Sequence, residues 1–253
     1  MRPVKGMSVV VTGGGSGIGA TTARHFVERG ARVTVFGRRE DRVRGLAEEL
    51  GEACAWVAGD VTDAGDRQRL VERAVRHGGS VDVLVNGAAN MYRGDIDALD
   101  EDQLLGVFHS NVVAAMMLTG LAVPHLVERR GCVVFFGSVH VKRAFPGASP
   151  YAATKGALEA VTGVLAAELG PRGVRVSCVR PGGVFSELNQ RAGLFDDEAA
   201  RARLDALGAA HALGRPGTPE EVAEAIEYLA RAEWTTGAVL VVDGGLSLGT
   251  TNA

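Results

Sequence analysis

The sequence has few cysteines and no long hydrophobic run. Its 253 residues include only Cys54, Cys132 and Cys178, and each lies in an apolar stretch. An odd number of widely spaced thiols argues against a disulfide framework or a zinc site, so we expect buried structural thiols and no metal. No stretch reaches about 18 uninterrupted apolar residues, and the N-terminus lacks the pattern of a signal peptide. We therefore expect a cytoplasmic protein without a membrane partner.

The sequence also lacks an excess of positive charge, because its formal net charge is -3. Nucleic-acid phosphates bind to basic surfaces, so we expect no nucleic-acid partner. Hydrophobic residues make up 46% and charged residues 23%, which is ordinary globular usage and excludes a disordered chain. Glycine is in excess: 35 residues are about twice the usual share of ~7%. Such a content indicates tight turns or backbone that approaches a ligand closely.

Short apolar segments alternate with longer helical patterns along the whole chain. The expected strands cover residues 8–12, 32–36, 53–58, 81–88, 132–137, 174–179 and 238–242. The expected helices cover 20–29, 40–50, 64–76, 102–128, 151–169, 187–212 and 219–230, the last with Thr218 as its N-cap. Strands that are apolar throughout form parallel sheets covered on both faces. The pattern predicts one α/β domain over residues 1–253, a Rossmann-like, doubly wound parallel sheet with helices on both faces, whose ligand lies beyond the carboxyl ends of the strands.

A glycine-rich turn follows the first expected strand. Five glycines fall within the seven positions 13–19, where an ordinary strand-to-helix turn needs one. Gly13, Gly17 and Gly19 form a G-x-x-x-G-x-G spacing, which departs from the more common G-x-G-x-x-G pattern. Because such a turn presents backbone N–H groups and a helix N-terminus to an anion, the motif predicts a phosphate cradle.

Three polar residues near the fifth strand are spaced like a catalytic group. Ser138 follows that strand, and Tyr151 and Lys155 share one face of the next helix. A free tyrosine has a pKa near ~10, which is too high for a base at neutral pH, and a nearby lysine favours the phenolate. The three residues therefore predict proton transfer by Tyr151, with Lys155 lowering its pKa and Ser138 holding the substrate oxygen.

These motifs together closely resemble the short-chain dehydrogenase/reductase family over nearly the whole chain, and in particular its 3-oxoacyl carrier-protein reductases. The resemblance implies a catalytic tetrad of Asn111, Ser138, Tyr151 and Lys155, in which Asn111 supports a water-linked proton relay. It also implies that the cofactor contacts Gly13, Gly15, Ser16, Gly17, Ile18, Gly19, Arg38, Arg39, Asp60, Val61, Asn86, Ala88, Tyr151, Lys155, Pro181, Gly182, Val184 and Ser186.

Two positions depart from the family's pattern. After the fourth strand the chain reads Asn86-Gly87-Ala88-Ala89 instead of Asn-Asn-Ala-Gly. We expect the cofactor still to pass beside this strand, but the local hydrogen bonds to differ from those of the family. The family often has a threonine whose hydroxyl holds the carboxamide of the nicotinamide. Ser186 stands at that position here, and its hydroxyl can supply the same contact.

The end of the second strand bears on which nicotinamide nucleotide binds. An acidic residue there would accept hydrogen bonds from the adenosine ribose and repel a 2′-phosphate, but this chain has Gly37 followed by Arg38 and Arg39. Arginine forks suit phosphate oxygens. The sequence therefore favours NADP(H). NAD(H) is the alternative, supported by Ser16, because NADP-using relatives often carry a basic residue at that position.

We expect an oxidoreductase that interconverts a ketone and a secondary alcohol by hydride transfer, acting on a small molecule. The alternatives are an NAD-dependent alcohol dehydrogenase of the same fold and a non-catalytic, cofactor-binding regulator, although the intact tetrad argues against the regulator. The resemblance implies a substrate lid at residues 186–213 and a homotetramer. Arginines 129, 130 and 172 could dock an acyl carrier protein, and His140 should form a wall of the substrate pocket.

Overall fold

The computed structural model describes residues 1–185, 187–188 and 196–249. The strands are β1 (Ser8–Thr12), β2 (Arg32–Gly37), β3 (Cys54–Ala58), β4 (Val83–Asn86), β5 (Cys132–Phe136), β6 (Arg175–Pro181) and β7 (Val239–Val242). The longer helices are α1 (Gly17–Glu28), α2 (Glu40–Leu50), α3 (Ala64–Gly78), α4 (Glu101–Phe108), α5 (Ala114–Arg129), α6 (Ser149–Leu169), α8 (Asp197–Gly208) and α9 (Pro219–Arg231).

The strands form one parallel sheet in the order β3-β2-β1-β4-β5-β6-β7. The order reverses between β1 and β4, and this switch point is where a doubly wound fold opens a crevice for its ligand. The predicted fold class is therefore confirmed. Every residue of β1 and β5 is buried, as expected for central parallel strands that carry helices on both faces.

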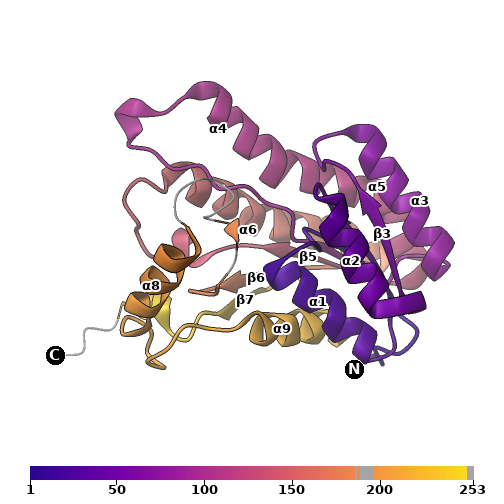
Figure 1. Ribbon diagram of the computed structural model, residues 1–253. Helices are drawn as coiled ribbons and strands as arrows, with labels where there is room; N and C mark the ends of the chain where they lie inside the picture. Colours follow the sequence, from indigo (N-terminus) through magenta and orange to yellow (C-terminus); the bar gives the residue numbers. More distant parts are fainter. Residues whose placement is uncertain (186, 189–195, 250–253) are drawn as a thin grey trace.

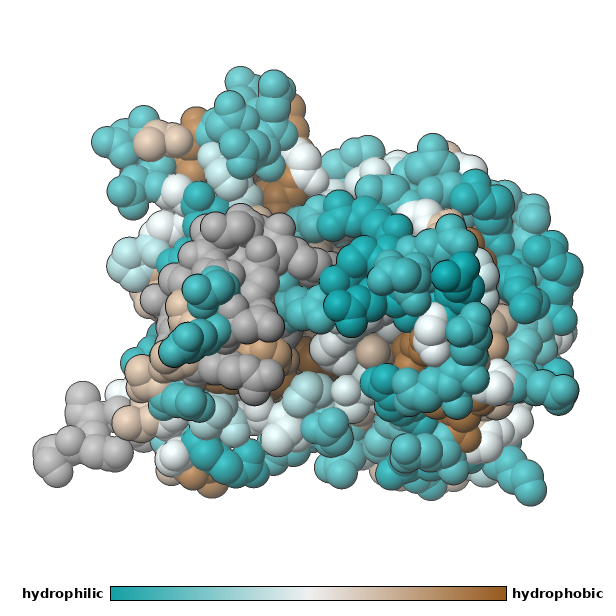
Figure 2. All heavy atoms as spheres, viewed as in Figure 1, coloured by the Kyte–Doolittle hydropathy of each residue, from teal (hydrophilic) through white to brown (hydrophobic). Residues whose placement is uncertain are grey.

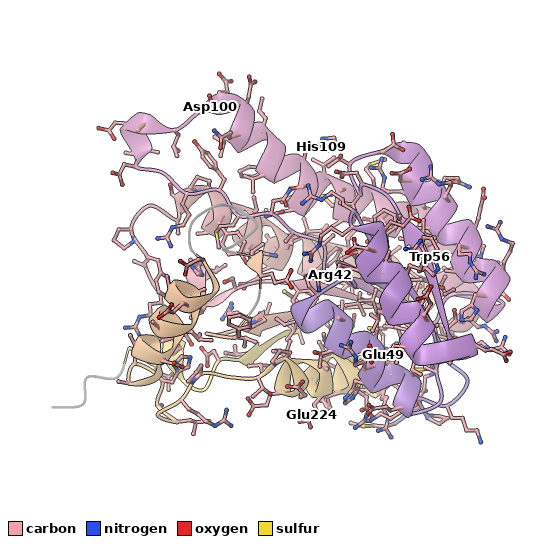
Figure 3. The ribbon with its side chains drawn as sticks, in the orientation of Figure 1. Arg42, Glu49, Trp56, Asp100, His109 and Glu224 are labelled. Carbon is pink, nitrogen blue, oxygen red and sulfur yellow. The ribbon has the colours of Figure 1, made fainter. Side chains whose placement is uncertain are left out.

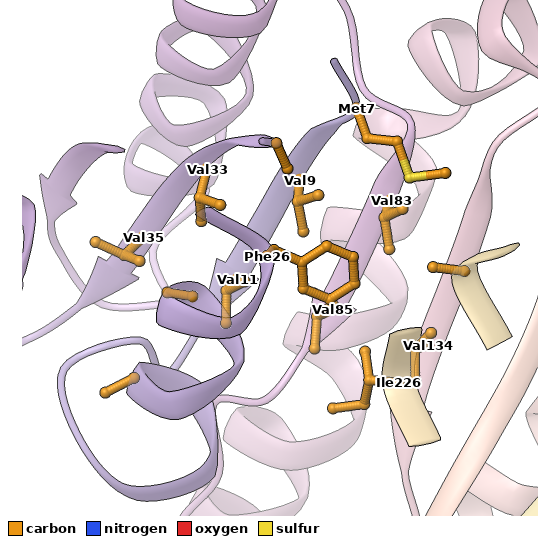
Figure 4. Packing of buried hydrophobic residues seen from close by; sticks show 14 of the residues in the cluster. Met7, Val9, Val11, Phe26, Val33, Val35, Val83, Val85, Val134 and Ile226 are labelled. Carbon is orange, nitrogen blue, oxygen red and sulfur yellow. The ribbon is translucent and has the colours of Figure 1, made fainter. Parts of the chain in front are cut away.

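Helices cover both faces of the sheet (Figure 1). One hydrophobic core joins the sheet to α1, α2 and α9, and the other joins it to α3, α5 and α6. Figure 4 shows the first core, where the ring of Phe26 from α1 lies over the valines of the central strands and beside Ile226 of α9. This packing fixes α1, and with it the glycine turn, on the sheet.

The long helix expected over residues 102–128 is interrupted. Helices α4 and α5 are joined by one turn of π-helix over His109–Val113. Its first residue, His109, is labelled in Figure 3. Single π turns inside α-helices are frequent at functional sites. By length and composition alone the combined span Glu101–Arg129 could cross a membrane, which is weak evidence because core helices pass the same test.

Two smaller predictions are confirmed. The three cysteines are free, buried thiols in β3, β5 and β6. Helix α9 begins with the predicted capping box, in which Thr218 accepts from the Glu221 backbone and Glu221 accepts from the Thr218 backbone. The cap fixes the start of α9 next to Gly217, which forms a backbone bridge to Val184 in the segment after β6.

Candidate active site

The glycine turn between β1 and α1 is shaped by contacts that exclude side chains. Gly13 and Gly17 have positive φ angles of 70° and 49°. A Cβ at Gly13 would lie 2.7 Å from the carbonyl oxygen of Gly87, and one at Gly19 would collide with the carbonyl of Gly13. Ser16 is the N-cap of α1, yet its side chain makes no capping hydrogen bond. The first N–H groups of α1 are thus left without a side-chain cap, and the cradle suits a phosphate group.

The segment after β4 explains one departure from the family's pattern. A Cβ at Gly87 would lie 2.7 Å from the carbonyl oxygen of Thr12, so glycine at this position lets the segment lie against the end of β1. The Ala88 amide donates to the Thr12 hydroxyl at 3.0 Å. The amide of Asn86 instead donates to Thr119 of α5 at 3.2 Å and is buried, so Asn86 supports the segment from behind.

Three cavities follow one another along the carboxyl ends of the strands. The first, beyond β2 and β3, is lined by Arg38 and Asp60 together with Gly13 of the glycine turn. The second is also lined by Gly13 and extends to Ser138 and Tyr151, which it shares with the third. The shared residues join the three cavities into one cleft from the end of β2 to beyond Tyr151, an arrangement that suits a dinucleotide with a second molecule at its far end.

Ser138, Tyr151 and Lys155 meet where the second and third cavities join. Tyr151 and Lys155 lie in the first two turns of α6 and are 7% and 3% exposed, and the Lys155 Nζ lies 5.5 Å from the centre of the phenol ring. The Ser138 Oγ lies 3.0 Å from Nδ1 of His140, whose ring meets that of Tyr151 edge-on. His140 also lines the third cavity, as predicted.

Burial dominates the proton affinities of this group. It raises the pKa of Tyr151 to about 12, with the hydrogen bond to Ser138 acting in the opposite direction. Burial also lowers the pKa of Lys155 to about 8. Our expectation that Lys155 brings the pKa of Tyr151 below its ordinary value was wrong, because both side chains are almost fully desolvated. Tyr151 therefore carries a proton to donate at neutral pH, but it is a weaker acid than a free tyrosine, whose pKa lies closer to neutral pH.

Asn111 lies in the π turn and is fully engaged by its neighbours. Its amide nitrogen donates to the Asn90 carbonyl at 2.9 Å and to the Thr154 hydroxyl at 3.1 Å. Its amide oxygen accepts from the Asn90 backbone at 2.7 Å and from the Ser110 hydroxyl at 3.1 Å. Asn111 therefore ties the segment after β4 to the residue next to Lys155, and the π turn that aims it was not predicted.

The two arginines after β2 have different surroundings. Arg39 forms an ion pair with Glu187 at 2.7 Å, whereas Arg38 donates to the amide oxygen of Asn90 at 3.1 Å. Among the residues that the structure describes, no carboxylate lies within 4.0 Å of Arg38. Burial acts to raise the pKa of Asp60, but hydrogen bonds from Thr62 and the charge of Arg38 outweigh it and lower that pKa.

The segment after β6 closes the cleft on its other side. A Cβ at Gly182 would lie 2.7 Å from the Cα of Asp243, so only glycine fits beside the end of β7. Gly183 donates its backbone N–H to Nε2 of the buried His211, 3.3 Å away, a contact that a lone histidine in the sequence could not signal. Ser186 and residues 189–195 of the predicted lid at 186–213 lie outside the described residues, and α8 makes up most of the described remainder of that segment.

The remaining cofactor residues line the cleft as follows: Ser16, Gly17, Ile18, Gly19, Lys155, Pro181 and Val184 line the second cavity, and Val61 and Ala88 the first. Gly15 lines none of the three cavities that form the cleft.

A larger hollow lies at the opposite end of the strands from the cleft. It is lined by Arg129, Arg130 and Arg172 and by the fully exposed Trp234, at the amino ends of β5, β6 and β7. β6 has seven residues and so spans roughly 20 Å. The arginine cluster is therefore separated from Tyr151 by the length of the sheet.

Comparisons with known proteins agree with this architecture. A family model described as enoyl-(acyl carrier protein) reductase matches residues 13–247. The chain is 39% identical to an L-fucose dehydrogenase of Bos taurus, with 96% of this chain and 90% of that protein covered. It belongs to the short-chain dehydrogenase/reductase family, whose members are oxidoreductases that use NAD(P)(H).

Two solved structures are similar in fold. A short-chain dehydrogenase/reductase of unknown function from Caenorhabditis elegans, solved with cofactor, superposes with a TM-score of 0.91 at 28% identity and covers 98% of both chains. A 3-ketoacyl-(acyl-carrier-protein) reductase from Brucella melitensis, complexed with NADH, has a TM-score of 0.85 at 29% identity and covers 96% of this chain and 99% of that one. The glycine cradle described above fits the nucleotide that this family uses.

Proposed function

We propose that this enzyme is an NADP(H)-dependent oxidoreductase that interconverts a ketone and a secondary alcohol. The observation that carries the proposal is the meeting of Ser138, Tyr151 and Lys155 at the junction of two cavities, one lined by the glycine turn and one open to a substrate. When bound, the nicotinamide nucleotide supplies or accepts the hydride at the carbonyl carbon. Every other part of the reaction falls to side chains of this chain.

In the reducing direction, Tyr151 donates the proton that the carbonyl oxygen needs when its carbon accepts a hydride. The phenol is protonated at neutral pH, because its pKa of about 12 lies well above 7. Ser138 donates a hydrogen bond to the same oxygen and stabilises the charge that develops there. Lys155, whose Nζ lies 5.5 Å from the centre of the phenol ring, holds the cofactor ribose.

The third cavity supports a largely apolar substrate. Apart from Arg93, the polar side chains that line it belong to the catalytic group or to His140. The other side chains described in its wall are apolar, namely Met91, Val139, Phe145, Val184, Phe185, Leu188, Ala200, Leu204 and Leu207. The ring hydroxyl groups of a sugar would find few side-chain partners beyond these polar residues. We therefore favour an apolar ketone over an aldose, the substrate class that the name of the Bos taurus relative indicates.

The choice of NADP(H) rests on Arg38. Gly37 puts no carboxylate at the end of β2. Arg38 lines the first cavity, which we assign to the adenosine end of the cofactor, and no carboxylate among the described residues lies within 4.0 Å of it. The alternative is NAD(H), which the Brucella melitensis neighbour binds. Both hypotheses are tested by assaying a panel of apolar ketones and free aldoses with each cofactor. Turnover of aldoses alone, or preference for NAD(H), would contradict the proposal.

We also propose that the substrate is a free small molecule and that the enzyme is a homotetramer. The arginine cluster lies at the end of the strands opposite Tyr151, so a carrier protein bound there would not reach the active site of the same chain.

The proposal of a homotetramer rests on the outer face of α4 and α5. This face exposes apolar side chains, including Leu105, Met116 and Met117 at 60%, 42% and 53%. Figure 2 shows hydrophobic residues among hydrophilic ones on the projecting α4 segment. A monomeric mass in light scattering would overturn the tetramer.

A further inference from the structure

A buried ion pair lies directly behind the catalytic residues. Glu159 and Arg180 form two parallel hydrogen bonds, from Arg180 Nε to Oε1 at 2.7 Å and from Nη2 to Oε2 at 2.5 Å. Their side chains are only 11% and 10% exposed. Glu159 lies one turn after Lys155 on α6 and two turns after Tyr151. Arg180 immediately precedes Pro181, where the chain turns along the cleft.

The same pair contacts the strand that leads to Ser138. A Cβ at Gly137 would collide with the carboxylate of Glu159, so this carboxylate packs directly against the backbone before the catalytic serine. Gly137 is held in turn by β6, because its N–H donates to the Val179 carbonyl at 2.9 Å. One ion pair therefore joins the catalytic helix α6, the end of β5 and the end of β6.

Stability alone does not account for a buried pair at this position. Removing two charges from water costs about as much as their attraction returns, and apolar residues of similar volume often stabilise a protein equally well. A two-pronged arginine–carboxylate contact supplies defined geometry, because both side chains must lie in one plane at a fixed separation. The catalytic elements are the part of the protein where such geometry matters, since a displacement of about 1 Å can cost roughly a hundredfold in rate.

We propose that Glu159 and Arg180 are positioning residues for the reaction at Tyr151. They hold α6 at a fixed distance from Ser138 on β5 and from Pro181–Gly182 after β6, so that the proton donor, the serine hydroxyl and the cofactor segment stay aligned. Neither residue touches the substrate cavity. This inference rests on the proposed function, because it assigns the pair a role in the same reaction.

The test replaces the pair by apolar side chains of similar size, in the double variant Glu159→Leu/Arg180→Met. The control is Glu49→Leu/Arg24→Met, which removes an exposed pair with the same two-pronged contacts, at 2.7 and 2.8 Å, that joins α1 to α2 away from the cleft. Glu49 is labelled on α2 in Figure 3. Both variants are assayed for melting temperature, cofactor affinity, kcat and KM.

We expect both double variants to melt within about 4 °C of the wild type, which corresponds to about 1 kcal/mol for a chain of this size. The Glu159→Leu/Arg180→Met variant should lose kcat by about tenfold or more while KM and cofactor affinity change less than about threefold, because alignment rather than binding is lost. The control should keep its kcat. A kcat within about threefold of the wild type in the site variant would overturn the proposal.

Arg180→Lys decides the matter if the double variant does not fold. Lysine keeps the paired charge but cannot form two parallel hydrogen bonds, so kcat should still fall severalfold. An unchanged kcat in Arg180→Lys would show that charge alone is needed and would overturn the positioning role.

Amide hydrogen exchange separates failure of this inference from failure of the proposed function. If the wild type reduces no ketone with either cofactor, the proposed function fails, and the pair is judged by exchange over residues 136–140 and 180–184. Loss of the pair should speed exchange in both segments, whereas the α1–α2 control should not. Unchanged exchange in both segments would refute the positioning role even in an inactive protein.

Discussion

The two ends of the cleft are built in different ways. At the catalytic end, Asn111, Ser138, Tyr151 and Lys155 are all at most 8% exposed and are held by the ends of several strands and helices. At the other end, which we assign to adenosine, Arg38 is exposed, and it is the one arginine among the residues described in the cavity wall. On the proposed function, chemistry depends on buried residues that the fold fixes, whereas cofactor choice depends on a few exposed residues that can be replaced. Substitutions at the two ends should differ in size and in what they change.

The largest effect is expected at the buried end, for Tyr151→Phe. Phenylalanine keeps the packed ring but removes the transferable proton, and general acid–base catalysis contributes roughly 10²–10⁴-fold. We expect kcat to fall by that factor while cofactor affinity, measured by fluorescence titration, stays near that of the wild type. Turnover within a fewfold of the wild type would show that another group, with His140 as the nearest candidate, moves the proton.

The next largest effect is expected at the exposed end, for Arg38→Ala. Hydrogen bonds to charged groups contribute about 1.5–3 kcal/mol, so kcat/KM with NADPH should fall about tenfold or more, with little change for NADH. Arg39→Ala should cost less, because Glu187 already neutralises Arg39. Arg44→Ala on the outer face of α2 serves as the control and should change neither value. Equal losses with both cofactors in Arg38→Ala would remove the link to the 2′-phosphate.

Inverting the preference requires an acid at the end of β2, and the structure sharpens that design. A Cβ at Gly37 would lie 3.1 Å from Cγ1 of the buried Val43, so Gly37→Asp needs room that Val43→Ala would supply. The triple variant Gly37→Asp/Arg38→Ala/Val43→Ala should prefer NADH in kcat/KM. A retained preference for NADPH would place phosphate recognition elsewhere in the cleft.

The pH dependence tests the buried lysine. Burial lowers the pKa of Lys155 to about 8, so the side chain is charged below that pH and neutral above it. Tyr151 stays protonated over the same range. We expect kcat/KM for reduction to fall about tenfold between pH 7 and pH 9, because this parameter reports ionisations of the free enzyme. Lys155→Arg should abolish this decrease, and an identical decrease in that variant would assign it to another group.

Local motifs and apolar strands could be read from the sequence, whereas contacts between distant segments and the burial of single side chains could not. The glycine turn and the Tyr151–Lys155 spacing are local, and apolar strands directly indicate a parallel sheet. The π turn at Asn111 was missed because its residues continue an apolar helical pattern. The Glu159–Arg180 pair was missed because its partners are 21 residues apart, although Glu159 continues the same helix face as Tyr151 and Lys155. The pKa of Tyr151 was misjudged because spacing reveals a neighbouring charge but not the depth of burial.

The smallest effect is expected for Thr218→Ala, outside both ends of the cleft. This substitution removes the hydroxyl that accepts from Glu221 in the capping box of α9, and loss of an N-cap costs about 1 kcal/mol. We expect a melting temperature lower by about 2–4 °C, with kcat and cofactor preference unchanged. The bridge between Gly217 and Val184 makes this a sharp test of how far the rigid framework extends. A loss of turnover without further loss of stability would show that the start of α9 helps to hold the segment after β6. The residues needed for catalysis would then include the exposed start of α9 as well as the buried group around Tyr151.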